Sequence, residues 1–163
     1  MCCSFDFRGR NIRPAGEATV LDAGRTELQL RFGFPLAGGR LIINARAESA
    51  AEKPLFRGPL AHGRILIPAD CFHEWDKDRV KHTFLLPGRQ AMLLAGLRSG
   101  GGFAILTTAA NRSMAPVHGR MPLVLEEAWA QEWLEPGDGY RALLGQRPPE
   151  LMRIAGPAQG RLF

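Results

Sequence analysis

The stretch from Ala91 to Thr108, AMLLAGLRSGGGFAILTT, decides the fold class of this chain. It contains two short apolar runs, Ala91 to Leu97 and Phe103 to Thr108, which are separated by a segment with three glycines. Short apolar runs bounded by glycine are typical of buried β-strands, because a buried helix is usually longer. We therefore expect two strands here, as part of a β-rich core.

Short apolar or alternating runs recur along the chain, and 19 glycines and 12 prolines interrupt it throughout. This punctuation favours many short strands over long helices. Further strands are expected at Val20–Leu21, Leu28–Phe32, Leu41–Ala47, Arg64–Ile67, Phe72–Trp75 and His82–Leu86.

Two helices are expected between these strands. One covers 54–60 and follows a capping-box pattern at 49–52. The other covers 126–134, where acids fill the first turn and Trp129 and Trp133 lie four residues apart on one face. Both tryptophans are expected in the core rather than on a surface that stacks on bases.

The chain has 163 residues, of which 45% are hydrophobic and 23% charged. Such a chain forms one domain that needs no disulfide scaffold or structural metal, and its composition excludes disordered and collagen-like proteins. We place the domain at 1–146 and expect a loosely packed tail over 147–163, where periodicity is lost. No apolar run is long enough to span a membrane, and the N-terminus lacks an apolar signal region, so we expect a cytoplasmic protein.

The cysteines and the net charge give weaker indications. Cys2, Cys3 and Cys71 form no CxxC pair, so neither a disulfide framework nor a zinc ribbon is expected, and no metal or cofactor is predicted. The net charge is +5, with arginine far more frequent than lysine. This surplus suits a polyanion such as nucleic acid, although ordinary solubility charge also explains it.

Cys2 offers a specific chemistry if Met1 is removed. The N-terminal residue would then carry a free α-amine beside a thiol. An α-amine has a pKa of about 7.7–8.0, so part of it is neutral and nucleophilic at pH 7. Such an amine forms a Schiff base with an aldehyde, and the thiol can then close a thiazolidine ring. Cys2 therefore predicts an aldehyde partner, although a cysteine at this position is often incidental.

Three expected strand ends carry polar residues with a spacing of two, which puts side chains on one face. Asn44 and Arg46 share a face, as do His118 and Arg120, whereas Glu74 points away from its two neighbours. Each residue alone also has an ordinary explanation as a turn former, a solvated acid or a structural histidine.

Taken in order, these segments resemble the SRAP family, the SOS response-associated peptidases, which are abasic-site processing proteins. The resemblance runs through Met1-Cys2, Phe32-Gly33, Asn44–Glu48, Lys53–Arg57, Ile67–Asp70, Phe72–Trp75, Ala95–Leu97, Ile105–Asn111 and His118–Pro122. It implies an α+β fold: a β-rich single domain with barrel-like, strongly bent sheets flanked by short helices.

The resemblance also implies a reaction. Cys2 would form a covalent thiazolidine crosslink with an abasic site in single-stranded DNA during the DNA damage response, with autoproteolytic peptidase and lyase activity. Asn44 would hold the N-terminal amine, Glu74 would act as general acid and base, and His118 would move protons during opening of the sugar ring.

The partner implied is single-stranded DNA that contains abasic sites, without a membrane, and the protein would be nucleoid-associated when crosslinked. Arg46, Arg57 and Arg120 match family positions that hold phosphates, and Thr108 lies in a motif that lines the same site. Phe32 would stack on a base or lie in the core. The sequence leaves the oligomeric state open, with a monomer as the working expectation.

The chain departs from the family pattern at four positions. Cys3 and Ser4 replace glycine and arginine, Cys71 replaces glycine and His73 replaces tyrosine. Cys3 and Cys71 would either form a redox-sensitive lock or be independent replacements. Two other functions stay open: a cysteine hydrolase that cleaves peptides in trans, and a single-stranded DNA-binding module without catalysis.

Overall fold

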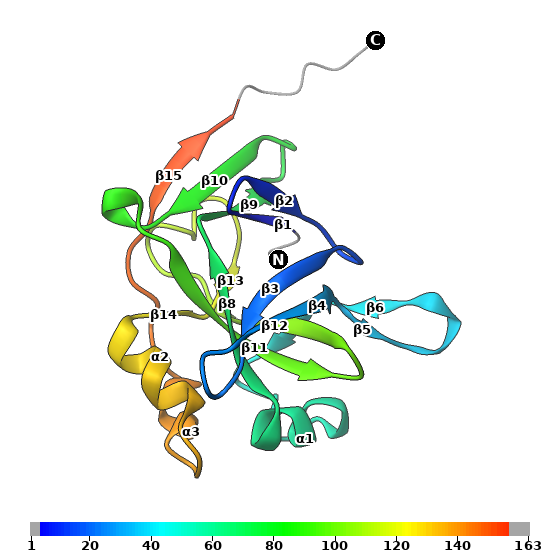
Figure 1. Ribbon diagram of the computed structural model, residues 1–163. Helices are drawn as coiled ribbons and strands as arrows, with labels where there is room; N and C mark the ends of the chain where they lie inside the picture. Colours follow the sequence, from blue (N-terminus) through cyan, green and yellow to red (C-terminus); the bar gives the residue numbers. More distant parts are fainter. Residues whose placement is uncertain (1–3, 157–163) are drawn as a thin grey trace.

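The computed structural model describes residues 4–156 and is a β-rich domain with three short α-helices (Figure 1). The strands are β1 (Ser4–Phe7), β2 (Arg10–Ile12), β3 (Glu17–Leu21), β4 (Glu27–Phe32), β5 (Phe34–Pro35), β6 (Leu41–Ile42), β7 (Asn44–Arg46), β8 (Arg64–Ala69), β9 (Cys71–Trp75), β10 (Lys81–Leu85), β11 (Met92–Ser99), β12 (Gly102–Ala109), β13 (Arg120–Pro122), β14 (Val124–Leu125) and β15 (Met152–Ala155). The helices are α1 (Pro54–His62), α2 (Glu127–Leu134) and α3 (Tyr140–Leu143), and 3₁₀ turns lie at Ala37–Gly39 and Pro87–Arg89.

Five strands close into a ring, which we call the barrel. The order is β12, β4, β3, β8 and β11, and β11 pairs again with β12. Only the β12–β4 pairing in this ring is parallel. Closure satisfies the backbone hydrogen bonds that an open sheet edge would expose. The expected α+β fold with barrel-like sheets and short helices is confirmed.

Three of the barrel strands, β8, β11 and β12, are apolar on both faces because both of their faces are covered. Alternate residues of β8 separate accordingly, with Ile65 and Ile67 in one apolar cluster and Leu66 in the other. Helices α1 and α2 pack on β8 and β11 and cover the second cluster. This explains the nearly continuous apolar runs around Ala91–Thr108, which are typical of strands buried on both sides.

The barrel closes tightly where β12 meets β4. A Cβ atom on Gly102 would lie 2.2 Å from the carbonyl oxygen of Gly33, which is closer than atoms approach. Gly33 has a φ of 122°, a backbone conformation that side chains disfavour. Its N–H donates to the carbonyl oxygen of Phe103 at 2.7 Å. Both glycines are therefore required by the close approach of the two strands.

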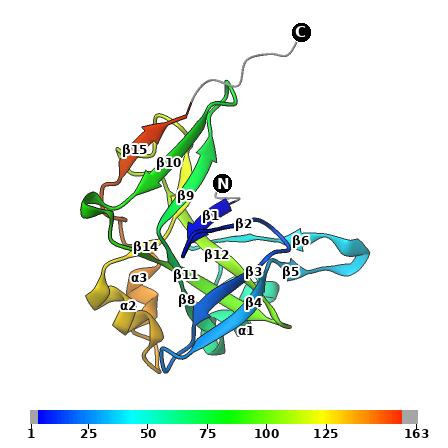
Figure 2. The same ribbon diagram turned by 45° about the horizontal axis from the view of Figure 1, so that its top comes forward.

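The remaining long strands form a second sheet, which we call the outer sheet, in the order β15, β10, β9, β1 and β2 (Figures 1 and 2). Its inner face packs on the barrel through aromatic rings. Phe5 of β1 meets Phe32 of β4 edge-on, with 5.6 Å between the ring centroids. Within the outer sheet, Phe72 of β9 stacks on Phe84 of β10 at 5.2 Å. The outer sheet thus places the N-terminal strand β1 between β9 and β2.

The two tryptophans of α2 have different positions. Trp133 is fully buried, and its Nε1 donates to the carbonyl oxygen of Ile65 at 2.9 Å. Trp129 remains 37% exposed, so the prediction that it lies in the core is wrong. The helix starts at Glu127 and has only two turns, so its narrow buried stripe includes Ala130, Trp133 and Leu134 but excludes Trp129.

The segment expected to be a loose tail is attached to the domain over its described part, 147–156. Strand β15 pairs with β10, and Leu151 is buried in the core. The side-chain amide of Asn111 donates to the carbonyl oxygens of Pro148 at 3.1 Å and Pro149 at 2.8 Å. The expectation of loose packing is therefore wrong for 147–156, because backbone hydrogen bonds hold it, while the domain limit itself stays a prediction.

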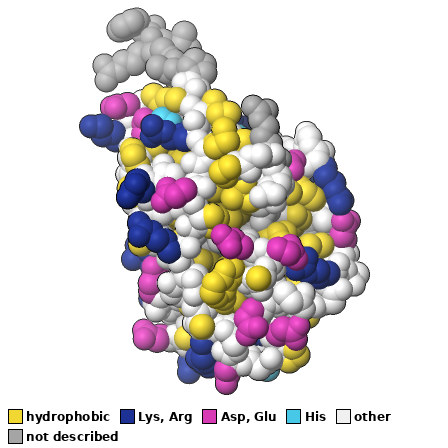
Figure 3. Space-filling model, turned by 90° about the vertical axis from the view of Figure 1, so that its left-hand side faces the viewer, with side chains coloured by type: hydrophobic (Ala, Val, Ile, Leu, Met, Phe, Trp, Pro, Cys, Tyr) yellow, Lys and Arg dark blue, Asp and Glu magenta, His cyan; other side chains and the backbone are white. Residues whose placement is uncertain are grey.

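One face of the molecule is shown in Figure 3. Basic and acidic side chains are interspersed there with hydrophobic ones, so this face is not uniformly basic. Within residues 4–156, no helix is long and apolar enough to cross a membrane.

Candidate active site at the N-terminal strand

The structure places the start of the described chain beside Glu74. Ser4 pairs with His73 in the β1–β9 register, and Phe5 pairs with Phe72. Glu74 is only 5% exposed, and its Oε1 accepts a hydrogen bond from the backbone N–H of Trp75 at 3.2 Å. Cys2 and Cys3 lie outside the described residues. A buried carboxylate therefore lies on the strand that pairs with the N-terminal segment.

Asn44 begins β7, which runs parallel to β12 with Asn44 opposite Ile105. Its Nδ2 makes a long hydrogen bond of 3.5 Å to the carbonyl oxygen of Ile105. Its Oδ1 is buried and has no hydrogen-bond partner among the described residues. Because a buried acceptor without a partner is costly, this oxygen is suited to receive an N–H group from a ligand or from the N-terminus.

His118 lies at the end of a loop that is stabilised by hydrogen bonds to the buried side chain of Asn111. Asn111 is 1% exposed, and its Oδ1 accepts hydrogen bonds from the backbone N–H groups of Ser113 and Met114. The loop then buries Val117 in the core. Nδ1 of His118 accepts from the N–H of Arg120 at 3.0 Å, which fixes the orientation of the ring.

These segments border the same apolar cluster. In sequence, each predicted catalytic residue of the described chain lies within two positions of a residue that belongs to this cluster or packs against it. Ile43 precedes Asn44, Phe72 lies two residues before Glu74, and Val117 precedes His118. Phe5, which follows Ser4, belongs to it as well. The fold thus gathers segments that are far apart in sequence around one cluster.

The predicted DNA-binding residues differ in what their side chains contact. Arg120 donates two hydrogen bonds to Glu48, at 2.8 and 2.9 Å, and one to the carbonyl oxygen of Thr107 at 2.9 Å. This pairing lowers the pKa of Glu48, mainly through the hydrogen bond. Arg46 and Arg57 are exposed. Arg120 is therefore engaged within the protein, whereas Arg46 and Arg57 present their charge to solvent.

The other two predicted DNA contacts are buried. Thr108 is 8% exposed and lies on β12 opposite Met121. Phe32 is completely buried and stacks on Phe103, with 5.1 Å between the ring centroids. Its ring lies in the core, which is the second of the two positions expected for Phe32, and it exposes no face on which a DNA base could stack.

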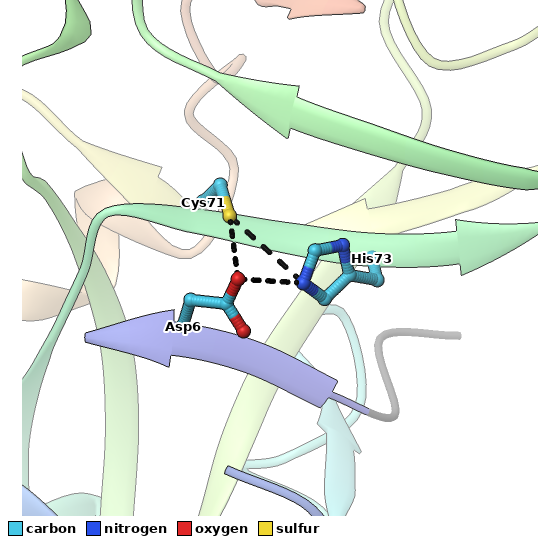
Figure 4. Close-up of side chains that lie close together, drawn as sticks. All are labelled: Asp6, Cys71 and His73. Atoms are coloured by element: carbon cyan, nitrogen blue, oxygen red, sulfur yellow. Dashed lines mark hydrogen bonds and ion pairs between the residues drawn. The ribbon is translucent and has the colours of Figure 1, made fainter. Parts of the chain in front are cut away.

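Sequence reasoning missed a polar cluster on the outer sheet, formed by Asp6, Cys71 and His73 (Figure 4). Nε2 of His73 lies 3.1 Å from Oδ2 of Asp6, and Sγ of Cys71 lies 3.4 Å from the same oxygen. Burial and the nearby charge of Asp6 raise the pKa of the Cys71 thiol to about 12. The thiol is therefore protonated at neutral pH. Cys3, its partner in one of the two alternatives given above, lies outside the described residues.

The pKa of Asp6 is lowered in this cluster. Burial alone would raise this pKa, but hydrogen bonds from Asn11 and His73 outweigh it. Cys71 and His73 stood out in the sequence as departures from the family pattern. The signal for Asp6 was the alternation of Ser4 to Phe7, which marks β1.

Comparisons with known proteins agree with this architecture. Residues 15–154 match the family model described as SOS response associated peptidase (SRAP). The Bacillus subtilis protein named abasic site processing protein YoaM is 38% identical over 77% of this chain and 65% of its own length. The Escherichia coli protein named abasic site processing protein YedK is 35% identical over 57% of this chain and 47% of its own. The chain spans about half to two thirds of the length of the curated relatives it matches.

Solved structures show the same fold. A protein from Bacteroides thetaiotaomicron superposes with a TM-score of 0.78 at 18% identity, over 89% of this chain and 76% of that chain. A phage-related protein from Bordetella bronchiseptica gives 0.73 at 25% identity, over 91% of this chain and 82% of that chain. Since the family model matches residues 15–154, which is most of the sequence, this chain belongs to the SRAP family.

Proposed function

We propose that this protein processes abasic sites in single-stranded DNA by forming a covalent thiazolidine crosslink through Cys2. The observation that carries the proposal is the pairing of Ser4 with His73, which brings the N-terminal strand next to the buried Glu74. The names of the relatives YoaM and YedK supply the substrate class.

The reaction requires removal of Met1 first. Hydrolysis of the Met1–Cys2 peptide bond consumes one water molecule and frees the α-amine. In this proposal the cleavage is autoproteolytic, and Glu74 acts as the base that takes a proton from the attacking water. Glu74 is 5% exposed and lies on β9, the strand that pairs with the N-terminal segment, where its carboxylate can exchange a proton with a bound water.

The crosslink then forms in two steps, formation of a Schiff base and closure of a ring. The free amine of Cys2 adds to the aldehyde carbon of the ring-opened deoxyribose, and loss of one water leaves a Schiff base. The thiol adds to the same carbon, its proton moves to the nitrogen, and a five-membered thiazolidine ring results. Proton transfers in these steps are assigned to Glu74 and His118, whose ring is oriented by Arg120.

Asn44 is assigned the role of holding the α-amine. Its buried Oδ1, which has no partner in the described chain, is an acceptor for an amine N–H. Satisfying this oxygen would offset the cost of leaving it buried, so amine binding is favoured at this position. A fixed amine would also be oriented for attack on the aldehyde.

DNA binding is assigned to backbone charge rather than to base reading, because an abasic site offers no base. Arg46 and Arg57 are exposed and can contact phosphates, while Arg120 would have to leave Glu48 to do so. Thr108 contributes to the lining of the site. The protein would act in the cytoplasm, on the nucleoid, as part of the DNA damage response.

The test is a covalent shift assay. Purified protein, with Met1 removal verified by mass spectrometry, is incubated with a single-stranded oligonucleotide that contains one abasic site, and the mixture is separated on a denaturing gel. A shifted band is expected for the wild type and for Cys3→Ala, and none for Cys2→Ala. The same oligonucleotide without the abasic site is the substrate control.

The outcomes separate the three candidate functions. Absence of a covalent band from protein lacking Met1 would overturn the crosslinking proposal. Equal, salt-sensitive binding of intact and abasic strands without an adduct would instead indicate a simple DNA-binding module. Turnover of added peptides would indicate a hydrolase that acts in trans. Glu74→Gln should slow adduct formation, and an unchanged rate would remove its assigned role.

A further inference from the structure

We propose that Asp6, Cys71 and His73 form a binding site for one divalent metal cation of the zinc type on the outer sheet. Within residues 4–156 this is the one place where three side chains of metal-ligating types converge. The site joins β1 to β9 and uses two residues, Cys71 and His73, at which the chain departs from the family pattern. Its three side chains are not among those assigned to the crosslinking chemistry proposed for Cys2.

The distances between the three donor atoms fit a tetrahedral ion. Oδ2 of Asp6 lies 3.1 Å from Nε2 of His73 and 3.4 Å from Sγ of Cys71. The distance from Sγ of Cys71 to Nε2 of His73 is 3.9 Å. Metal–ligand bonds of about 2.0 Å to oxygen and nitrogen and about 2.3 Å to sulfur, at tetrahedral angles, give separations of about 3.3–3.6 Å. The donors therefore need to move by only a few tenths of an ångström.

Two of the three residues, Asp6 and His73, also make hydrogen bonds outside the cluster, as metal ligands usually do. Nδ1 of His73 lies 3.0 Å from Oγ1 of Thr83, which leaves Nε2 to face the cluster. Asn11 donates to Oδ1 of Asp6 at 2.6 Å, which leaves Oδ2 to face it. Such outer hydrogen bonds fix the orientation and tautomer of ligating groups. In both residues the outer hydrogen bond occupies the atom that faces away from the cluster, so the other atom stays available to a metal. Polar side chains that meet by chance would not be expected to show this arrangement twice.

The donor set indicates the class of metal. One thiolate, one imidazole and one carboxylate suit Zn²⁺ and are a poor set for Mg²⁺ or Ca²⁺, which prefer oxygen. On binding, the S–H bond of Cys71 breaks, its proton passes to bulk water, and a metal–sulfur bond forms. Asp6 is partly exposed, with 36% of its side chain accessible, so water can occupy a fourth position. No oxidation or reduction is involved.

The experiment measures binding of Co²⁺ as a spectroscopic substitute and of Zn²⁺ by competition with a chromogenic chelator. The wild type is expected to bind one Co²⁺ with a thiolate-to-cobalt charge-transfer band and the visible bands of a tetrahedral ion. Cys71→Ser should lose the charge-transfer band, and His73→Gln should weaken Zn²⁺ binding by at least about 100-fold. Thr83→Val, which removes only an outer hydrogen bond, should weaken it about 10- to 100-fold.

Controls distinguish this site from the N-terminal cysteines and from other histidines. Cys3→Ala and His62→Gln, which changes an exposed histidine on α1, should leave the cobalt spectrum and Zn²⁺ affinity unchanged. Circular dichroism of each variant without metal shows whether it is folded. A charge-transfer band that survives Cys71→Ser, or loss of binding in Cys3→Ala, would overturn the site, as would failure of the folded wild type to bind either metal.

Discussion

The barrel and the outer sheet are built from the same kind of element but differ in what they bury. Strands β8, β11 and β12 of the barrel bury almost only apolar side chains. Strand β9 of the outer sheet buries His73 and Glu74 within five residues. Apolar burial stabilises without regard to direction, whereas buried polar groups must be hydrogen-bonded in defined geometry. The barrel therefore supplies stability, and the outer sheet positions chemical groups.

The largest expected effect is on the barrel. Phe103→Ala removes a fully buried ring that stacks on Phe32 and should lower the free energy of unfolding by about 3–5 kcal/mol. Urea denaturation followed by fluorescence measures this loss. Phe103→Leu is the matched control and should cost clearly less, because most of the volume is kept. If both variants lost the same free energy of unfolding, the loss could not be caused by the cavity that Phe103→Ala creates.

A smaller loss of stability is expected from Asn111, which binds the C-terminal segment through hydrogen bonds. Asn111→Ala leaves the N–H groups of Ser113 and Met114 without their side-chain acceptor and removes the donor to Pro148 and Pro149. The expected cost is about 2–3 kcal/mol of unfolding free energy.

The matched variant Asn111→Asp keeps the acceptor but not the donor. Hydrogen exchange should therefore show faster exchange in β15 for both variants, and faster exchange in the 113–118 loop for Asn111→Ala alone. Protection of β15 that is unchanged in both variants would show that the side chain does not hold this segment.

The outer sheet should tolerate loss of one polar contact. Thr83→Val removes the hydroxyl that contacts His73 while keeping the shape of the side chain, and should cost about 0.5–1.5 kcal/mol in the absence of metal. The measurement is again the urea midpoint. A cost comparable to that of Phe103→Ala would remove the contrast between the two regions.

The smallest expected effect is on the pH dependence of stability, through the Glu48–Arg120 ion pair. The hydrogen bond from Arg120 lowers the pKa of Glu48 below its usual value. A depressed carboxylate pKa contributes stability above the unfolded pKa of about 4.3, and this contribution is lost as the pH falls through the folded value. Because the pair is partly exposed, the loss should stay below about 1 kcal/mol.

Glu48→Gln tests this dependence. The stability of the variant should fall less steeply than that of the wild type between about pH 5 and pH 3, as measured by urea midpoints across that range. Parallel pH profiles would show that the pair does not contribute. The change also leaves Arg120 without its charged partner. Under the proposed function, Arg120 would then be available to phosphates, and the affinity for single-stranded DNA should rise.

Periodicity in the sequence was sufficient to predict most of the barrel. The runs at Arg64–Ile67, Ala91–Leu97 and Phe103–Thr108 correspond to β8, β11 and β12, because strands buried on both faces are continuously apolar. Strand β15 could not be predicted, since all four of its residues are exposed and it is held by backbone pairing. The expected strand Leu41–Ala47 is divided into β6 and β7 at Ile43.

The candidate site was predicted less completely. Spacing and resemblance singled out Asn44, Glu74 and His118, and the structure arranges their segments around one apolar cluster. The sequence does not show whether Phe32 is buried or exposed, because a phenylalanine at the end of a strand and before a glycine can occupy either position. The pairing of Arg120 with Glu48 depends on the register of β7, β12 and β13, which a single sequence does not contain.

The position of β1 between β9 and β2 has a mechanical consequence. Its interstrand hydrogen bonds run perpendicular to the strand on both sides. Tension applied at the N-terminal end along the strand axis would therefore load both ladders in shear, and their bonds would have to fail together rather than one at a time. If the proposed crosslink forms at Cys2, a force on the bound DNA strand would act on an anchor that resists in this way.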